Sequence, residues 1–251
     1  MTLIGNRMIH FDIVGSTNDE AWRLLQSENI EEGTIIYTRF QTAGRGQGGT
    51  SWESEAGSNL TFSLVLKPSY LPVSQQFLLN QAISVALCKT VSELCPMQKV
   101  TIKWPNDIYT GNKKIGGILI ENSIMGAIYE VAVVGIGLNI NQERFFSDAS
   151  NPVSLYQLSG QKTAVSKCLE TACHHLEVWT NILKMNDKEK IRHEYLSRLY
   201  GYGRELLFQS QERAFKARIT GISEYGKIIL NEDGINTEYD TKTLEFILST
   251  G

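Results

Sequence analysis

Residues 41–66, QTAGRGQGGTSWESEAGSNLTFSLVL, decide which fold the chain can adopt. Gly44, Gly46 and Gly49 spell G-x-G-x-x-G after a β-rich stretch, which is the glycine spacing of dinucleotide-binding folds. In those folds a helix begins inside the motif and points its N-terminus at a pyrophosphate. Here a second strand pattern follows instead, and apolar Leu64 stands near the place of the expected acidic residue. The sequence therefore predicts a glycine-rich loop between two strands.

This glycine-rich loop, residues 41–52, still has the chemistry of a binding loop. No G-K-[ST] closes it, as in a P-loop, and the chain has neither the H-R-D nor the D-F-G motif of kinases. Glycines let successive N–H groups turn toward one anion, Arg45 offers a fork for a carboxylate or phosphate, and Trp52 offers a face for a base. The alternative is a plain hairpin loop that Trp52 anchors to the core.

Apolar periodicity on both sides of the loop predicts a mixture of helices and strands. Thr17 and Glu20 have the spacing of a capping box, so a helix should begin just after Thr17. Periods of 3.6 and 2 residues indicate the other elements. Helices are expected at 74–94, 163–183 and 187–200, and strands at 8–14, 34–41, 59–68, 100–104, 114–122 and 129–140. This mixture predicts an α+β fold in which helices flank a mixed central β-sheet.

The chain changes character near residue 203. After the GYG stretch at 201–203 only short strand patterns remain, and an Asp-Gly turn signal lies in NEDGI at 231–235. We therefore expect a domain at 1–202 and a small all-β module, barrel-like, at 203–251.

Composition excludes several classes of protein. The net charge of −3 and the absence of a basic stripe argue against a nucleic-acid surface. No apolar run is long enough to span a bilayer, and the N-terminus does not have the pattern of a signal peptide. We therefore expect no membrane partner. The four cysteines include no C-x-x-C pair, which favours reduced thiols in a cytoplasmic protein.

A second group of polar residues lies in KWPNDIYTGNKKIGGILIE, residues 103–121. Pro105 stops a strand, so Asn106 and Asp107 are expected in a loop at the strand end, where functional polar groups concentrate. Lys114 opens the next strand and should point near Asp107. A lysine beside a carboxylate and an anion-binding loop is the equipment for adenylate chemistry, in which a carboxylate attacks the α-phosphorus of ATP.

Taken together, the two stretches resemble the biotin protein ligases. GRGQGGTSW at 44–52 is similar to the family pattern G-R-G-R-x-G-x-x-W, and residues 103–121 are similar to K-W-P-N-D-[IL]-Y-x-x-x-x-K-[IL]-x-G-[IL]-L-x-E. GSTN at 15–18 and GIGLNIN at 135–141 also fit. The resemblance covers residues 8–141 and implies the class II synthetase type of sheet, with an SH3-like C-terminal barrel by architecture alone.

The resemblance implies a role for each matching residue. Lys114 would bridge the biotin carboxylate and the α-phosphate, and Arg45 and Asp107 would assist it; Asp107 would also help to organise either a metal ion or the attacking lysine of the acceptor. Gln41 would bind the ureido ring, and Trp52 would stack on adenine. The implied biotin contacts are Ser16, Thr17, Asn18, Gln41, Gly44, Arg45, Gly46, Gln47, Lys114 and Gly117, and the implied nucleotide contacts are Trp52, Asn106, Lys114 and Asn139.

The implied activity is the activation of biotin with ATP and Mg²⁺ to biotinyl-5′-AMP, followed by transfer to a lysine of a biotin carboxyl carrier domain. A lipoate or octanoyl ligase and a non-catalytic biotin or nucleotide sensor remain as alternatives. Because GSTN begins at residue 15, we expect a ligase without a helix-turn-helix and without DNA binding. Family members often pair through a sheet edge, so a homodimer is an expectation by analogy.

One residue departs from the family pattern. Gln47 stands where the family usually has a second arginine, so a fixed charge is replaced by a neutral amide. The loss of one charge-assisted hydrogen bond is worth about 1.5–3 kcal/mol. The sequence therefore predicts that this chain retains the adenylate less tightly than its relatives do.

Overall fold

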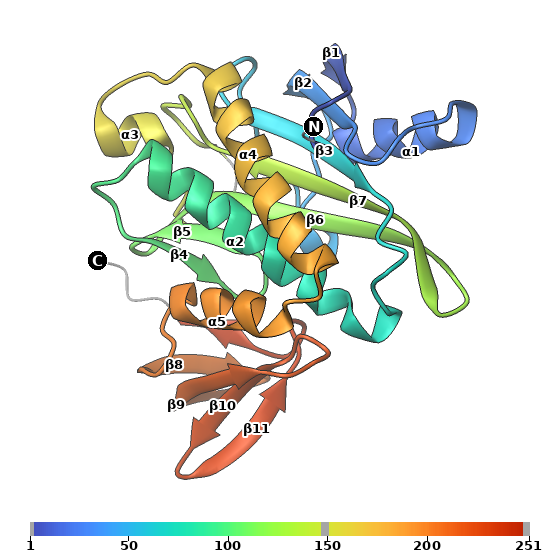
Figure 1. Ribbon diagram of the computed structural model, residues 1–251. Coiled ribbons are helices and arrows are strands. Elements are labelled where there is room, and N and C mark those ends of the chain that lie inside the picture. The colour runs from blue at the N-terminus through green and yellow to red at the C-terminus, as the bar shows by residue number, and fades with distance from the viewer. Residues whose placement is uncertain (1–2, 147–150, 248–251) are drawn as a thin grey trace.

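A seven-stranded mixed sheet forms the centre of the computed structural model, which describes residues 3–146 and 151–247. The outer pair of strands, β1 and β2, is parallel, and every other neighbouring pair in this sheet is antiparallel. Figure 1 shows the sheet behind the helices. In sheet order the strands are β1 (Met8–Val14), β2 (Ile35–Gln41), β3 (Leu60–Leu66), β7 (Ile128–Leu138), β6 (Lys113–Met125), β5 (Asp107–Thr110) and β4 (Val100–Lys103).

Alternating side chains give the sheet two different faces. Leu64 and Val134 point into the main core, whereas their neighbours Val65 and Val133 belong to a smaller cluster on the opposite face. Helices α2 (Gln76–Leu94) and α4 (Val165–Lys184) cover the first face, and α5 (Lys188–Arg198) packs beside α2 (Figure 1). The expected α+β architecture with flanking helices is confirmed.

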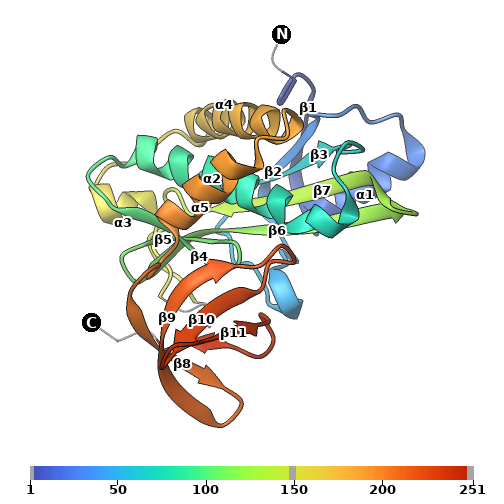
Figure 2. The same cartoon turned by 60° about the horizontal axis from the view of Figure 1, so that its bottom comes forward.

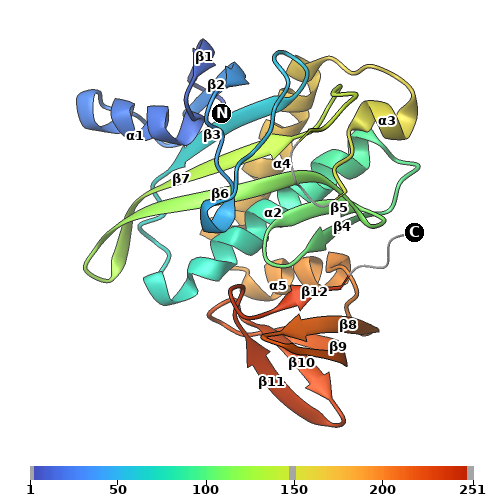
Figure 3. The ribbon, with the colours of Figure 1, turned by 180° about the vertical axis from the view of Figure 1, so that it is seen from behind.

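The second face is covered only in part. Helix α1 (Thr17–Ser27) packs its buried Ala21 and Leu24 on it at the β1–β3 end. Seen from behind in Figure 3, the glycine-rich loop crosses in front of the middle strands of this face. The sheet thus leaves room for a site between α1, the loop and the centre of β6 and β7.

The C-terminal strands form a second, five-stranded antiparallel sheet below the first (Figure 2). Its turn at Asp233–Gly234 has positive φ at both residues, as the Asp-Gly signal predicts. Phe208 and Ile219 from this sheet join the main core, so the boundary near residue 203 and the SH3-like description stay predictions. In sheet order the strands are β11 (Ile235–Tyr239), β10 (Ile228–Glu232), β9 (Arg213–Ile222), β8 (Glu205–Ser210) and β12 (Glu245–Phe246).

Three local predictions were wrong or incomplete. Helix α1 begins at Thr17, so Ser16 and not Thr17 is its N-cap; no side-chain cap forms, and the Thr17 hydroxyl, already inside the helix, bonds to Gln41. Asp107 is not in a loop: it begins β5, which forms a hairpin with β4 that the periodicity did not show. The short helix α3 (Leu155–Ser159) and the single turns Gln47–Gly49 and Val73–Gln75 were also not predicted.

Two further expectations concern cysteines and membranes. All four cysteines are buried and unpaired. Burial raises the pKa of the Cys88 thiol to about 11, so it stays protonated near neutral pH. Within residues 3–146 and 151–247, no helix has the length and apolar character needed to cross a bilayer.

Candidate active site

A cavity of about 270 Å³ opens on the partly covered face of the sheet. Its floor is formed by β6 and β7, and its walls by the start of α1, the glycine-rich loop and the turn between β4 and β5. The lining residues are Ser16, Thr17, Asn18, Gln41, Arg45, Gly46, Gln47, Thr50, Trp52, Pro105, Asn106, Asp107, Lys114, Gly117, Ile118, Leu119, Gly135, Ile136 and Gly137. Two separate motifs of the sequence therefore meet in one cavity.

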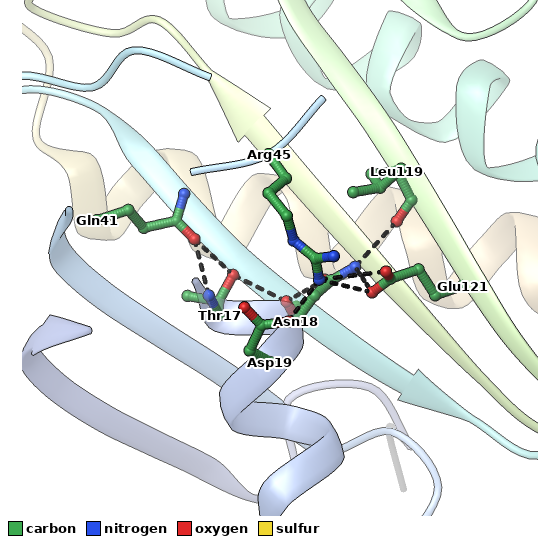
Figure 4. Close-up of polar contacts among 8 residues, drawn as sticks. Thr17, Asn18, Asp19, Gln41, Arg45, Leu119 and Glu121 are labelled. Atoms are coloured by element: carbon green, nitrogen blue, oxygen red, sulfur yellow. Dashed lines mark hydrogen bonds and ion pairs between the residues drawn. The ribbon is translucent and has the colours of Figure 1, made fainter. Parts of the chain in front are cut away.

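A buried polar network forms one end of the cavity (Figure 4). The backbone N–H and the hydroxyl of Thr17 both donate to Gln41 Oε1, at 2.8 and 3.1 Å. The Ser63 hydroxyl lies within hydrogen-bond distance of Thr17 Oγ1 (2.8 Å) and Asn18 Oδ1 (2.6 Å). Asn18 Nδ2 donates to Glu121 Oε2 at 2.8 Å. Ser63 was not among the predicted site residues, because nothing in its β-strand pattern distinguishes it from a core serine.

Arg45 is the cation of the glycine-rich loop, and its guanidinium is held by two carboxylates. Arg45 Nη2 lies 2.5 Å from Asp19 Oδ1 on α1 and 3.2 Å from Glu121 Oε1 on β6. Figure 4 shows the arginine reaching from the loop toward both residues. Since a guanidinium has five N–H donors, further donors remain for an anionic ligand, but the charge is already shared. The two carboxylates were not predicted as parts of the site.

The loop itself is a small hairpin rather than an unstructured connection. Gly46 N donates to Thr50 O at 2.7 Å, and Trp52 N donates to Gly44 O at 2.9 Å. A Cβ at Gly44 would lie 2.6 Å from the carbonyl oxygen of Trp52, so only glycine allows this closure. Gly44 therefore shapes the loop and does not line the cavity.

Trp52 lies flat against the floor at the other end of the cavity. A Cβ at Gly137 would meet its ring at 2.3 Å, and one at Gly117 would meet it at 3.4 Å. The two glycines pair across β6 and β7, so together they leave a flat bed for the indole. The indole Nε1 is buried and has no hydrogen-bond partner among the described residues.

Lys114 and Asp107 form an ion pair at this second end. Lys114 Nζ lies 2.8 Å from Asp107 Oδ1 and 5.7 Å from the centre of the Trp52 ring. Both side chains are about one quarter exposed, so the pair borders the cavity without being sealed from solvent. Asn106, beside them, donates from Nδ2 to the carbonyl of Ile118 and so fixes the turn to β6. The expected meeting of Lys114 with Asp107 is confirmed.

The floor strand β7 sets the spacing of the two ends. Asn18 covers Gly135, where an added Cβ would lie 2.5 Å from Asn18 Oδ1, and Trp52 covers Gly137. Two residues of a β-strand span roughly 7 Å. Between the two ends the half-buried Leu119 of β6 lines the cavity, whereas the side chains of Ile118 and Ile136 belong to the main core on the other face of the sheet. The cavity thus suits an elongated molecule with a hydrogen-bonding head, an apolar middle and an anionic tail.

The predicted site residues meet in this cavity with two exceptions. Gly44 lies behind the lining, as described above, and Asn139 lies beyond the end of β7. Asn139 is buried; its Nδ2 donates to Val153 O at 3.2 Å, while its Oδ1 has no partner among the described residues. The sequence did not reveal the remaining lining residues Thr50, Pro105, Ile118, Leu119, Gly135, Ile136 and Gly137, although GIGLNIN contains the last three.

Comparisons with known proteins place these features in a class of protein-modifying ligases. The sequence profile of the biotin/lipoate A/B protein ligase family matches residues 10–139, more than half of the chain. The chain belongs to this family.

Relatives and solved structures agree with that assignment. The bifunctional ligase/repressor BirA of Bacillus subtilis is 29% identical over 241 residues, which are 94% of this chain and 73% of that protein. The biotin–[acetyl-CoA-carboxylase] ligase of Paracoccus denitrificans is 29% identical over 222 residues, covering 86% and 90% of the two chains. The biotin protein ligase of Aquifex aeolicus in complex with biotin and ATP has a TM-score of 0.81 at 24% identity, covering 97% and 100%, which shows a common fold.

Proposed function

We propose that the chain is a biotin protein ligase, which activates biotin with ATP to biotinyl-5′-AMP and transfers the biotinyl group to a lysine of a biotin carboxyl carrier domain. The observation that carries this function is the single cavity that joins a buried polar end to the Lys114–Asp107 pair under a glycine-rich loop. The polar end offers donors and acceptors for a ureido ring. The ammonium at the other end offers a positive charge for the carboxylate.

The first half-reaction joins two anions and so needs a cation between them. The carboxylate oxygen of biotin attacks the α-phosphorus of ATP, a P–O bond forms, and the bond to pyrophosphate breaks. Lys114 would hold the carboxylate and the α-phosphate together and offset the charge that builds up between them. Arg45 and the loop amides would hold the phosphate, once Arg45 shares or leaves its two carboxylates.

The nucleotide would lie at the Trp52 end. Part of the half-buried indole is accessible for stacking with adenine. Two buried polar atoms, Trp52 Nε1 and Asn139 Oδ1, have no partner among the described residues, and such atoms are costly unless something satisfies them. Asn139 Oδ1 is an acceptor and suits the amino group of adenine, which supports its predicted role.

Mg²⁺ would enter with the nucleotide. Within the described ranges, no group of three or more histidine, cysteine, aspartate or glutamate side chains is arranged to hold a metal ion. Mg²⁺ commonly takes one or two carboxylates together with substrate phosphates, and Asp107 is the acidic residue that lines the cavity. Asp107 would therefore hold the ion together with ATP, and the ion would neutralise charge on the phosphates.

The acceptor would dock at the free edge of the main sheet. Strand β1 is an outer strand and pairs only with β2 in the described part of the chain, whereas the opposite edge strand, β4, is bridged at Ile102 by Leu199. An extended segment of the carrier can add to β1 by strand pairing. The deprotonated amine of its lysine then attacks the acyl carbon of the adenylate, and AMP leaves.

Three finer expectations remain part of the proposal. The same β1 edge is where a second copy of the chain would pair in a homodimer. The net charge of −3 supports a ligase that acts without binding DNA. The buried reduced thiols support a cytoplasmic location.

Biotin-dependent exchange of pyrophosphate into ATP tests this function. We expect exchange with biotin and labelling of a carrier domain, and a loss of about 100-fold or more in Lys114→Ala. The neighbouring exposed Lys113→Ala is the matched control and should behave as wild type. Exchange with lipoate alone would indicate a lipoate ligase, and biotin binding without exchange would indicate a sensor. Unchanged carrier labelling by Lys114→Ala would contradict the role of Lys114.

A further inference from the structure

Lys103, the last residue of β4, lies beside the active-site ion pair although it does not line the cavity. In the antiparallel β4–β5 hairpin, Lys103 is directly opposite Asp107. Residues opposite each other in such a pair project from the same face of the sheet. On the other side of β5, Asp107 is opposite Gly117 of β6, and Lys114 of the same strand reaches its carboxylate at 2.8 Å. One carboxylate is therefore bracketed by two lysines.

The ammonium of Lys103 lies among aromatic rings from two parts of the fold. Lys103 Nζ is 3.5 Å from the hydroxyl of Tyr109 and 5.2 Å from the centre of its ring. It is also 5.3 Å from the ring of Phe246, which comes from β12 of the C-terminal sheet. Figure 3 shows β12 next to the β4–β5 edge of the main sheet. Cations over aromatic faces at these distances are attracted by the ring quadrupole.

Phe246 is itself held in place by other rings. Its ring packs edge-on against Phe208 at 5.0 Å and against Tyr200 at 6.4 Å. Phe208 is fully buried in the core shared by both sheets. The C-terminal sheet thus provides a fixed surface on which the Lys103 side chain lies.

Lys103 keeps a positive charge in a partly buried place without a direct ion pair in the described ranges. Burial lowers the pKa of Lys103, and the charge of Lys114 acts in the same direction, while Asp107 and Glu245 act against it. A lysine whose role was only to cover the aromatic rings could be replaced by an apolar residue without electrostatic cost. Because Lys103 is opposite Asp107, its positive charge attracts the carboxylate of that residue.

We propose that Lys103 is a positioning residue that holds Asp107 and, through it, Lys114, and that Phe246 makes the C-terminal sheet part of this arrangement. This inference rests on the proposed ligase function. When Lys114 binds an anionic substrate, its pull on Asp107 weakens. Lys103 then keeps the carboxylate in place from the β4 side, so that Lys114 is aimed correctly at the reacting groups.

The first test compares Lys103→Met with Lys103→Arg in biotin-dependent ATP–pyrophosphate exchange. Small misplacements of catalytic groups cost up to about 100-fold in rate. We expect kcat of Lys103→Met to fall by about tenfold or more, while the KM for biotin changes little. Lys103→Arg, which keeps a positive charge, should recover most of the rate. Lys99→Met, which removes an exposed lysine just before β4, is the matched control and should leave kcat unchanged.

A double-mutant cycle separates positioning from a general structural effect. If Lys103 acts through Asp107, the loss caused by Lys103→Met should largely disappear in an Asp107→Asn background. Independent, multiplying losses in kcat would overturn the inference, as would an equal loss in Lys103→Arg and Lys103→Met. A wild-type protein without biotin-dependent exchange would instead remove the proposed function on which the inference rests.

The part played by the C-terminal sheet is tested at Phe246. Phe246→Leu removes the ring beside Lys103, and Phe246→Tyr keeps it; Tyr239→Leu removes an aromatic ring of the same sheet that lies against Phe215 instead. Thermal unfolding of each variant shows whether the fold is intact. We expect folded Phe246→Leu to lose several-fold in kcat and the other two variants to match wild type. A folded Phe246→Leu with wild-type kcat would exclude the C-terminal sheet from the arrangement.

Discussion

Arg45 of the glycine-rich loop is ion-paired to Asp19 at the start of α1, with Nη2 2.5 Å from Oδ1. Glu121 on β6 holds the same guanidinium from the other side at 3.2 Å. The loop is therefore tied by its only arginine to two of the elements that form the polar end of the cavity, α1 and β6 (Figure 4). An anionic ligand that uses Arg45 has to compete with these carboxylates. The free energy needed to break the ion pairs of Arg45 therefore opposes the binding of an anionic ligand to this residue.

Weakening the Arg45–Asp19 ion pair should tighten the binding of ATP. In Asp19→Asn the arginine keeps Glu121 but loses its second carboxylate, so more of its charge is available to phosphate. Because the pair is exposed, the gain is modest, about two- to fivefold in the KM for ATP. Glu28→Gln breaks the similarly exposed Arg7–Glu28 pair away from the cavity. This variant is the control and should leave the KM for ATP unchanged. A higher KM in Asp19→Asn would mean that Asp19 contacts the substrate or its metal ion.

Gln47 should limit how long the adenylate stays bound. The residue lines the cavity and is exposed, so an arginine there can reach a phosphate but is partly screened by solvent. We expect Gln47→Arg to release biotinyl-5′-AMP about tenfold more slowly, at the low end for a charge-assisted hydrogen bond. Thr42→Arg adds the same charge to an exposed loop position that does not line the cavity. Release from wild type that is equal to or slower than release from Gln47→Arg would refute the prediction.

Gly137 should be essential for the position of Trp52. A methyl group there would lie 2.3 Å from Trp52 Cε2, so Gly137→Ala has to displace the indole. Base stacking on an aromatic ring is worth about 1–3 kcal/mol, so the KM for ATP should rise about tenfold. Gly221→Ala in β9 meets nothing closer than 3.6 Å and serves as the control. A shift in tryptophan fluorescence without a change in the KM for ATP would separate Trp52 from nucleotide binding.

The pH dependence of adenylation should report the charge of Lys103. Burial lowers the pKa of this lysine, so it becomes neutral at a lower pH than an exposed lysine does. Burial also raises the pKa of Tyr109, which therefore stays neutral over the same range. The other charged groups that act on Lys103 are Asp107, Lys114 and Glu245.

As pH rises, kcat should fall when Lys103 loses its proton. Arginine stays charged throughout, so the alkaline fall in Lys103→Arg should move to higher pH. The measurement is kcat for ATP–pyrophosphate exchange across the alkaline range in both proteins. Coincident profiles would show that another group sets the alkaline limb.

Much of the fold and part of the site could be predicted because the signals are local. The strand pattern that follows Gly49 excluded a dinucleotide-binding fold, and the Asp233–Gly234 turn appeared where its dipeptide indicated. The motifs also predicted that Lys114 lies near Asp107, since only a short hairpin separates them. The sequence did not show strand β5, because Pro105 predicts the end of a strand but not that the chain turns back within three residues to pair with β4.

By itself the sequence determined most of the helices and strands, where the glycine-rich loop lies and which polar residues that loop carries. Only the tertiary structure decided that Arg45 is tied to Asp19 and Glu121, that Thr17 bonds to Gln41 rather than capping its helix, and that Phe246 lies beside Lys103. The physical reason is the separation along the chain over which each kind of interaction acts. Periodicity and turn chemistry act between near neighbours in the chain, whereas these contacts depend on strand order and on how two sheets pack against each other.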